Sequence, residues 1–408
     1  MLQVTSYREF LRIPGVLPLL FASTFGRLAY SMVSLAMFFQ VQDVTKSVGT
    51  AGLAVGLSSL LGSLTAGPRG HLVDRYGQTR PLFVMVPLYS LSCFLLAFFA
   101  RDPLSAVLLS GLVGLTAPPI NISIRPLWTD IVGPERVRMA YSVDTAYMNV
   151  LQLLGPVIAT LVALHASPTV AIAFCGASML TGGLLLAVNR HSRRWVGEDK
   201  EPDEASIMRS PAMRLLALEG AAMGLSMGFV TIGIPAMATL SGEQSMAGPL
   251  MSAMGVGSII GVVWAGAKAH EIAPANGLRA SMGLFAIALL PLPFVPIGPW
   301  MMLVILVAWA MAGPAQVFYF ETIDVVRPRG TAVAALGSLW MIEGSAGALG
   351  NAIGGNMAEW WGPQSTLFAA CAIVIFSPII FTIGIRGPLR PASNAVPRES
   401  WAPAVDAD

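Results

Sequence analysis

The sequence predicts an all-α membrane protein with twelve transmembrane helices arranged as two six-helix halves, and three observations support this prediction. Apolar residues make up 55% of the 408 residues and charged residues only 11%, whereas charged residues reach about 25% in soluble domains. Twelve segments carry the roughly 20 mostly apolar residues that are needed to cross a bilayer. Short patterns from the first half of the chain also recur in the second half at a nearly constant offset.

The twelve apolar segments follow one another along the chain, and most connections between them are short. Their expected bounds are 16–39, 48–70, 81–100, 103–124, 138–164, 168–189, 211–240, 247–269, 279–297, 300–320, 331–358 and 365–385. The one longer connection, residues 190–210, is a charged linker between the predicted halves 1–189 and 211–386. Residues 387–408 are rich in proline, alanine and charge, so we expect a disordered tail there.

The distribution of basic residues predicts the orientation of the chain. If both termini lie in the cytoplasm, the inner segments hold 21 of the 24 lysines and arginines, and the outer loops hold only Lys46 and Arg101. Basic residues accumulate on the cytoplasmic side of membrane proteins. We therefore expect cytoplasmic termini, linker and tail, in a multi-pass protein of the plasma or inner membrane.

Two weak repeats indicate that the halves arose by duplication. Residues 129–134 precede the fifth apolar segment, and similar residues at 323–328 precede the eleventh, 194 positions later. Residues 61–64 in the second segment match residues 256–259 in the eighth, 195 positions later. Two matches at nearly one offset favour a parallel duplication of six helices, as found in some secondary transporters.

The stretch between the second and third apolar segments carries an unusual set of residues. They form the pattern G-x-x-x-D-R-x-G-x-x-R, made by Gly70, Asp74, Arg75, Gly77 and Arg80. The charges fix this loop at the membrane surface, and the glycines are expected to allow close packing and a sharp turn. The pattern resembles the loop 2–3 signature of the major facilitator superfamily. The resemblance implies a substrate site between the two halves and a conformational-switch loop in which Asp74 caps a neighbouring helix N-terminus.

The fifth apolar segment contains a glycine followed by a proline, Gly155 and Pro156. It resembles, in part, the Gly-Pro element of proton-driven drug exporters in that superfamily, although Leu151 replaces one glycine and Ala159-Thr160 replace the last pair. A kink with small neighbours lets a helix bend and approach another closely. We expect this element to contact the other half, although a tolerated membrane-helix proline is the alternative.

Four charged residues fall inside apolar segments, at an insertion cost of about 2.5–3.5 kcal/mol each. They are Arg27, Asp144, Glu219 and Glu343. Intramembrane carboxyl groups often mark ion pathways, so Glu343 is our first candidate for the proton carrier and Glu219 the second. Arg27 either pairs with a carboxylate or attracts an anionic substrate group. For each residue the alternative is a fixed structural ion pair.

Polar and aromatic residues in the remaining helices suit a cavity for an amphipathic organic molecule. The candidates are Tyr30, Asn121, Asn149, Gln152, Trp309, Gln316, Tyr319 and Trp340. Each of them is also a plausible packing or interhelical hydrogen-bonding residue.

The sequence also argues against other classes of protein. The three cysteines lie in apolar segments without disulfide or metal spacing, no Walker loop is present, and the four histidines have no catalytic spacing. We therefore expect no enzyme activity, no cofactor, no metal, no nucleic-acid partner and a monomer in the lipid bilayer. The predicted function is proton-coupled export of small organic compounds by an antiporter with alternating access. An importer or facilitator of sugars or metabolites, or a transport-incompetent membrane sensor or scaffold, is the alternative.

Overall fold

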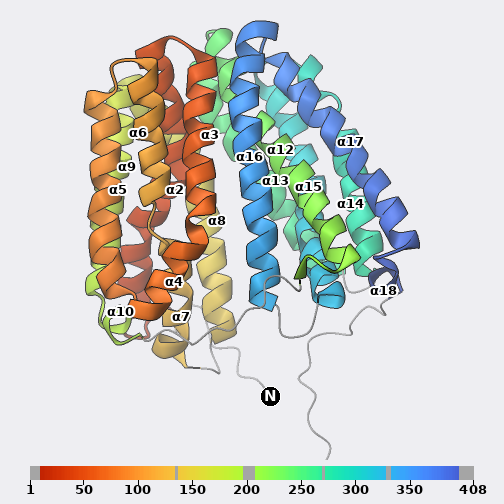
Figure 1. The fold of residues 1–408 in the computed structure, drawn as a ribbon, viewed down its shortest axis with the longest axis horizontal. Coiled ribbons are helices and arrows are strands. Elements are labelled where there is room, and N and C mark those ends of the chain that lie inside the picture. Colours follow the sequence, from red (N-terminus) through yellow and green to blue (C-terminus); the bar gives the residue numbers. More distant parts are fainter. Residues whose placement is uncertain (1–9, 134–136, 196–206, 269–271, 328–331, 395–408) are drawn as a thin grey trace, which may run out of the picture. The chain divides into compact units, whose positions relative to one another are not determined.

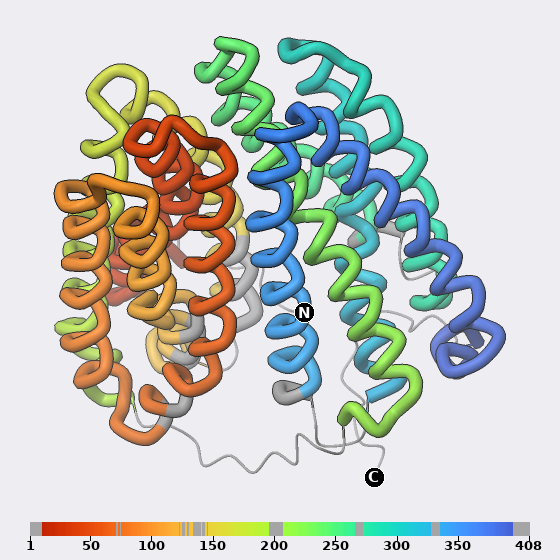
Figure 2. The backbone as a smooth tube through the Cα atoms, turned by 45° about the horizontal axis from the view of Figure 1, so that its top comes forward, coloured from red at the N-terminus to blue at the C-terminus, as the bar shows by residue number. Residues whose placement is uncertain are grey.

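The computed structural model describes residues 10–133, 137–195, 207–268, 272–327 and 332–394, and these residues form helices without any strand (Figure 1). The chain divides into two compact units. The first comprises Met1–Lys200 together with Ala247–Ser252, and the second comprises Glu201–Met246 and Ala253–Asp408. Each unit is a bundle of helices with its own buried core, as the tube in Figure 2 also shows.

The first unit is built around one long helix, α2. Its helices are α2 (Val16–Thr45), α3 (Val48–Leu64), α4 (Ala66–Tyr76), α5 (Thr79–Phe99), α6 (Pro103–Thr116), α7 (Ile120–Val132), α8 (Val137–His165), α9 (Pro168–Val188) and α10 (Arg190–Arg194). Helix α2 packs against α8 and α9, while α3 packs against α6 and α5 against α9. The functional residues of this unit therefore lie where α7 and α8 meet α2.

The second unit is built around α12 in the same way. Its elements are α12 (Pro211–Leu240), η1 (Gln244–Met246), α13 (Ala247–Lys268), α14 (Pro274–Leu289), η3 (Leu292–Phe294), α15 (Pro299–Val326), α16 (Ala332–Trp361), α17 (Gln364–Arg386) and α18 (Arg390–Ser393). Helix α12 packs against α16 and α17. A Cβ atom added at Gly224 would meet the Glu343 carbonyl, and one at Gly228 would meet the Gly347 carbonyl. Glycine thus allows the close approach of α12 and α16.

Nine helices in the described part of the chain are long and apolar enough to cross a membrane. Two predicted spans differ from expectation because each is interrupted. The span predicted at 48–70 breaks at Thr65, between α3 and α4, and the span predicted at 103–124 breaks between α6 and α7. Pro118 and Pro119 explain the second break, since proline lacks an N–H donor and restricts the preceding residue. The protein is a multi-pass membrane protein, and twelve complete spans stay a prediction.

Two short helices lie within the expected linker and tail. Helix α10 occupies the start of the linker. Helix α18 occupies 390–393 of the tail, and the Asn276 amide donates a hydrogen bond to the Ser393 carbonyl. The first part of the tail therefore contacts α14, and disorder of the rest stays a prediction. Residues 196–206 and 395–408 lie outside the described residues.

Candidate functional site

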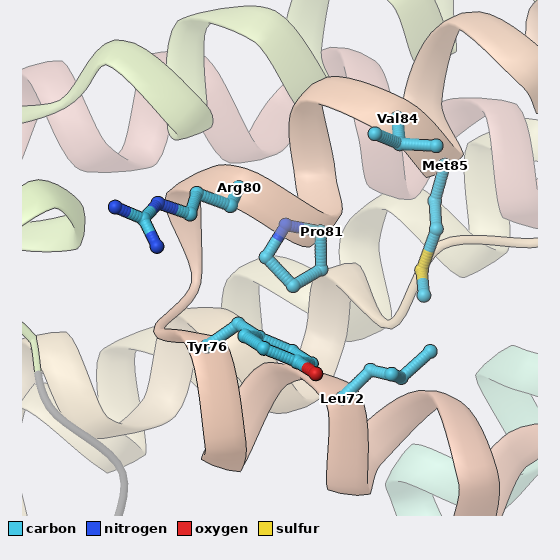
Figure 3. Close-up of a pocket in the computed structure, with 6 residues that line it drawn as sticks. All are labelled: Leu72, Tyr76, Arg80, Pro81, Val84 and Met85. Atoms are coloured by element: carbon cyan, nitrogen blue, oxygen red, sulfur yellow. The ribbon is translucent and has the colours of Figure 1, made fainter.

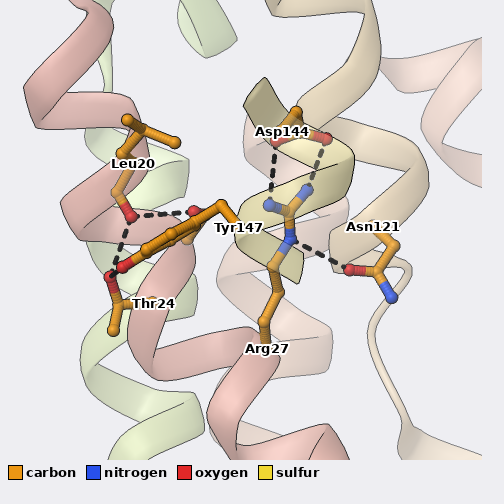
Figure 4. A network of polar contacts seen from close by, with 7 residues as sticks. Leu20, Thr24, Arg27, Asn121, Asp144 and Tyr147 are labelled. Atoms are coloured by element: carbon orange, nitrogen blue, oxygen red, sulfur yellow. Dashed lines mark hydrogen bonds and ion pairs between the residues drawn. The ribbon is translucent and has the colours of Figure 1, made fainter. Parts of the chain in front are cut away.

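The first unit contains a buried ion pair, formed by Arg27 of α2 and Asp144 of α8 (Figure 4). Arg27 Nη1 donates to Asp144 Oδ1 at 2.8 Å, and Nη2 donates to Oδ2 at 2.9 Å. Arg27 Nε donates to Asn121 Oδ1 of α7 at 3.3 Å. The side chains of the pair are 3% and 4% exposed. This bidentate geometry is the strongest arrangement for an arginine and a carboxylate, and it neutralises both charges.

A second polar contact lies one turn along the same two helices. The Thr24 hydroxyl donates to the Leu20 carbonyl at 2.9 Å, and it lies 2.5 Å from the Tyr147 hydroxyl of α8. Thr24 and Tyr147 are each three residues from a member of the ion pair, so they share its helix faces. The interface between α2 and α8 therefore carries two neighbouring polar contacts (Figure 4).

A small cavity of about 80 Å³ adjoins the ion pair. It is lined by Arg27, Tyr30, Ser31, Asn121, Met148 and Gln152. Three of the predicted cavity residues, Tyr30, Asn121 and Gln152, are thus brought together in one place, while Asn149 is not part of this lining. Because Asp144 neutralises Arg27, the cavity presents hydrogen-bonding groups without net charge. Its volume suits a small polar group or a few water molecules.

Arg69 of α4 is a functional candidate that the sequence analysis missed. Its Nε donates to the Thr65 carbonyl at 3.0 Å, Nη2 donates to the Gly62 carbonyl, and Nη1 donates to the carbonyls of Gly114 and Ala117. These acceptors lie at the ends of α3 and α6, where helix termini leave carbonyls unsatisfied. One guanidinium therefore ties together the two helix interruptions. In the sequence, Arg69 lies at the end of an apolar segment and is counted with the basic residues of the following loop.

The same interruption also engages Tyr30 of α2. Its hydroxyl donates to the carbonyl of Pro118, in the break between α6 and α7. Interrupted helices near membrane depth are tolerated where they are buried in protein or line a cavity. The break between α6 and α7 satisfies this condition because Asn121, in the first turn of α7, lines the 80 Å³ cavity.

The second unit contains a buried carboxyl group of a different kind, Glu219 of α12. Its side chain lies in a residue that is 2% exposed. The Ser377 hydroxyl of α17 donates to Glu219 Oε1 at 2.5 Å. Glu219 Oε2 has no hydrogen-bond partner among the described residues, and no ion pair joins Glu219 there. Glu219 is therefore a buried acid without a described counterion.

Tyr319 and Glu343 lie close to Glu219. The Tyr319 hydroxyl of α15 donates to the Leu216 carbonyl of α12 at 3.2 Å. A Cβ atom added at Gly220, next to Glu219, would lie 3.2 Å from the Tyr319 hydroxyl and 3.9 Å from Glu343 Cβ. Glu343 of α16 is half-buried. Both predicted proton carriers are thus within the same part of the second unit.

The remaining predicted cavity residues of the second unit are dispersed. Trp309 is buried, and its ring packs edge-on against Phe285 with the ring centroids 5.5 Å apart. Trp340 is exposed and packs against Phe320, and Gln316 is exposed. None of these residues lines either of the two cavities described here. Trp309 thus packs against Phe285, and its role in a substrate cavity stays a prediction.

The predicted switch loop is shorter than expected. Helix α4 continues to Tyr76 and α5 begins at Thr79, so only Gly77 and Gln78 connect them. Gly77 has φ of +75°, a conformation that favours glycine. Gly70 lies inside α4, and a Cβ atom there would meet nothing within 4 Å. Gly70 therefore has no close neighbour among the described residues, and the close packing expected there stays a prediction.

The charged residues of this loop are described only in part. Arg75 and Arg80 are exposed. The side chain of Asp74 lies outside the described part of the structure, so the capping role predicted for it stays a prediction.

Gly155 and Pro156 lie inside α8. A Cβ atom at Gly155 would collide with Ser31 of α2, in the same unit, and the predicted contact of this element with the other half stays a prediction. Glycine is needed here because α2 and α8 approach closely. On the next residue, the Pro156 carbonyl lies against Gly248, one of the six α13 residues that belong to the first unit.

These features define a class of protein. Long apolar helices that enclose an ion pair and an unpaired carboxyl group are characteristic of membrane transporters, in which buried charges serve transport. Residues 19–350 match the Major Facilitator Superfamily, and the chain belongs to this family. It is therefore a membrane transporter by family and not an enzyme.

Individual relatives agree with this assignment. The chain is 24% identical over 378 residues to the uncharacterized MFS-type transporter y4rN of Sinorhizobium fredii (strain NBRC 101917 / NGR234), covering 86% of this chain and 90% of that protein. A crystal structure of the nucleoside transporter NupG has a TM-score of 0.72 at 11% identity, covering 91% of this chain and 99% of that chain. An inward-facing bacterial homologue of the iron transporter ferroportin has a TM-score of 0.73 at 13% identity, covering 91% and 98%. At these identities the structures show a shared fold alone.

Proposed function

We propose that this protein is a proton-coupled secondary transporter that exports small organic compounds by alternating access. The observation that carries the proposal is Glu219, a buried acid whose Oε2 has no described partner. An isolated carboxylate is costly to bury, whereas a protonated carboxyl group is much less so. A group of this kind binds a proton when the site is closed and releases it when water or a cation reaches it. That cycle is what coupling to a proton gradient requires.

Glu343 has the second role in this proposal. The sequence favoured it as the proton carrier, but it is half-buried while Glu219 is buried. Both residues lie beside Gly220 and Tyr319. We assign the proton to Glu219 first and regard Glu343 as the group that exchanges it with water. Asp144 and Arg27 rank after these two acids in the proposal, because each charge of the pair already has its partner.

The substrate class follows from the cavity in the first unit. Tyr30, Asn121 and Gln152 offer hydrogen-bonding groups beside apolar surface, and the neutralised Arg27 adds no net charge. Such a lining suits an uncharged polar group, such as a hydroxyl or amide, on an otherwise apolar compound. The direction of transport in the proposal rests on the partial resemblance of Gly155-Pro156 to the element of drug exporters.

The proposal is tested in proteoliposomes with an imposed pH gradient. Everted and right-side-out vesicles are compared over a panel of amphipathic compounds. Glu219→Gln keeps the size of the side chain but cannot exchange a proton. We expect it to abolish accumulation against a gradient while leaving exchange down a gradient at least half intact. The matched control is Glu243→Gln, an exposed acid in the connection after α12, which should transport normally.

Three results would contradict the proposal. If Glu219→Gln and Glu343→Gln both accumulate substrate normally, neither acid carries the proton. An exporter accumulates substrate in everted vesicles. If accumulation occurs only in right-side-out vesicles, the protein is an importer. A gradient-independent flux in the native protein would identify a facilitator.

The switch loop is tested separately through Asp74, which we propose caps a neighbouring helix and, with Arg75 and Arg80, latches the outward-open state. A carboxylate at a helix N-terminus contributes about 0.3–1 kcal/mol. Asp74→Asn should therefore shift the conformational equilibrium about two- to fivefold toward the inward-open state and slow turnover, with normal membrane insertion. Labelling of single cysteines placed on the cytoplasmic side measures the shift. Unchanged labelling and unchanged turnover would remove the latch from the proposal.

A further inference from the structure

An apolar groove lies at the end of the first unit where α4 meets α5 (Figure 3). It has a volume of about 300 Å³ and is lined by Leu72, Tyr76, Arg80, Pro81, Val84 and Met85. The side chains of Leu72, Tyr76 and Val84 are 41–66% exposed. The groove is separate from the buried cluster of Arg27 and from the cavity beside it. Five of its six lining residues are apolar or aromatic, so the groove favours a hydrocarbon occupant.

The polarity of the groove changes along its length. Figure 3 shows Arg80 at one end, with its guanidinium pointing outward, and Leu72 and Met85 toward the other end. Met85 is five residues into α5 from Arg80, which corresponds to about 7–8 Å along a helix. The groove therefore runs from a cation at its mouth to apolar side chains further in. A phospholipid has the same order of phosphate and acyl chain.

More positive charge surrounds the mouth of the groove. The guanidinium of Arg75 lies 5.4 Å from the centroid of the Tyr76 ring, which holds it at the rim. Helix α10 is attached to the same loop because the Ser192 hydroxyl donates to Gln78 Oε1 at 3.1 Å. Arg193 and Arg194, next to Ser192, are exposed.

Among the residues that the structure describes around the groove, basic side chains outnumber acidic ones. Asp130 pairs with His191 of α10. On α4, α5 and the connection between them, Asp74 is the one acid in the sequence, and its side chain lies outside the described residues. The arginines of this loop and of α10 would therefore attract an anion to the mouth of the groove.

We infer that this groove is a binding site for an anionic phospholipid, with one acyl chain between α4 and α5 and the phosphate at Arg80 and Arg75. A chain of this class fits the apolar walls, and the charge of its headgroup complements the arginines. Basic pockets of membrane proteins on the side of an anionic leaflet recognise lipid headgroups in this way. The occupant would contact Tyr76 and Arg80, on either side of the connection Gly77–Gln78, so its presence would stiffen the predicted switch loop.

The experiment is native mass spectrometry of the purified full-length protein, delipidated in detergent and titrated with single lipids. Phosphatidylglycerol is compared with phosphatidylcholine of the same acyl chains. We expect the first phosphatidylglycerol to bind at least tenfold more tightly than the first phosphatidylcholine. Each arginine near an anionic headgroup contributes about fivefold in affinity. Replacing both in Arg75→Gln with Arg80→Gln should weaken phosphatidylglycerol binding about 25-fold and leave phosphatidylcholine unchanged.

Further variants separate the groove from the charge. Val84→Trp fills the groove and should weaken both lipids, whereas Leu91→Trp, on an exposed position further along α5, should weaken neither. Arg101→Gln, beyond the opposite end of α5, is the charge control. Arg80→Lys keeps the charge and should keep the lipid preference. Melting temperatures of all variants verify that they are folded.

Three outcomes would overturn the inference. Equal binding of the two lipids to the native protein would show a nonselective annular contact. A retained preference in the double arginine variant would place the anion elsewhere. Full binding by Val84→Trp would show that the groove holds no acyl chain. None of these measurements requires transport, so they are independent of the proposed function.

Discussion

Asp144 in the first unit and Glu219 in the second are both buried carboxyl groups within long apolar helices, but their surroundings differ. Asp144 receives two charge-assisted hydrogen bonds from Arg27. Glu219 receives one hydrogen bond, from the Ser377 hydroxyl, and has no described counterion. The first carboxyl group is satisfied as an anion. In the second, Oε2 has no described hydrogen-bond partner, and protonation would remove the buried charge.

The difference shows how two intramembrane acids in one chain serve different purposes. A buried ion pair with good geometry holds helices in register, and removing one partner leaves an uncompensated charge. An unpaired buried acid contributes little to register and is instead sensitive to changes in solvation. The following predictions test this contrast, from the largest expected effect on stability to the smallest.

The largest effect is expected for Asp144→Asn. It leaves the Arg27 guanidinium buried without an anion, which typically costs about 3–5 kcal/mol. Unfolding followed by tryptophan fluorescence in detergent, with increasing denaturant, measures the loss. The matched control is the double variant Arg27→Met with Asp144→Leu. Because it removes both charges, its free energy of unfolding should stay close to that of the native protein. A double variant as unstable as Asp144→Asn would show that the ion pair contributes to the free energy of unfolding beyond the neutralisation of its two charges.

The next effect is expected for Arg69→Met. This change removes the donors to the carbonyls of Gly62, Thr65, Gly114 and Ala117. Leaving buried acceptors unsatisfied costs about 1–3 kcal/mol. Hydrogen–deuterium exchange should rise at the ends of α3 and α6. Arg101→Met removes an exposed arginine and should change neither stability nor exchange. Equal exchange in Arg69→Met and the native protein would mean that water satisfies the helix ends.

Gly155→Val is expected to have a somewhat smaller effect on the same helix pair. The new side chain would collide with Ser31 of α2, and overpacking of this kind costs about 1–3 kcal/mol. We also expect export to be lost, because α2 and α8 supply most of the residues that line the 80 Å³ cavity. Gly70→Ala is the control, since a Cβ atom there meets nothing within 4 Å. It should be neutral or slightly stabilising because alanine favours the helix. Normal stability of Gly155→Val would show that α2 and α8 separate easily.

The smallest effect on stability is expected for Glu219→Gln, in contrast to Asp144→Asn. An amide keeps the hydrogen bond with Ser377 and carries no charge, so the free energy of unfolding should change by less than about 1 kcal/mol. The loss of gradient-driven accumulation described above should occur without a loss of folded protein. A destabilisation as large as that of Asp144→Asn would show that Glu219 is ionised and paired in the native protein, and the contrast would fail.

Much of the helical architecture was predictable because hydrophobic segments of sufficient length must be helical in a bilayer. The predicted segments coincide with α2, α5, α9 and α12, for example, apart from their ends. The identity of the charged positions was equally accessible, since Arg27, Asp144, Glu219 and Glu343 interrupt apolar runs. The switch-loop pattern also led to the family that the match over residues 19–350 shows.

Only the tertiary structure decided which charges are partners. Arg27 and Asp144 are 117 residues apart, and no periodicity within one helix relates them, because their contact depends on how α2 packs against α8. The same holds for Arg69, whose acceptors lie at the ends of α3 and α6, and for Gly155, which faces Ser31 of α2. Local sequence specifies which segments enter the membrane because hydrophobicity is additive along the chain. Pairing of buried polar groups is a property of the three-dimensional packing, and the chain order does not contain it.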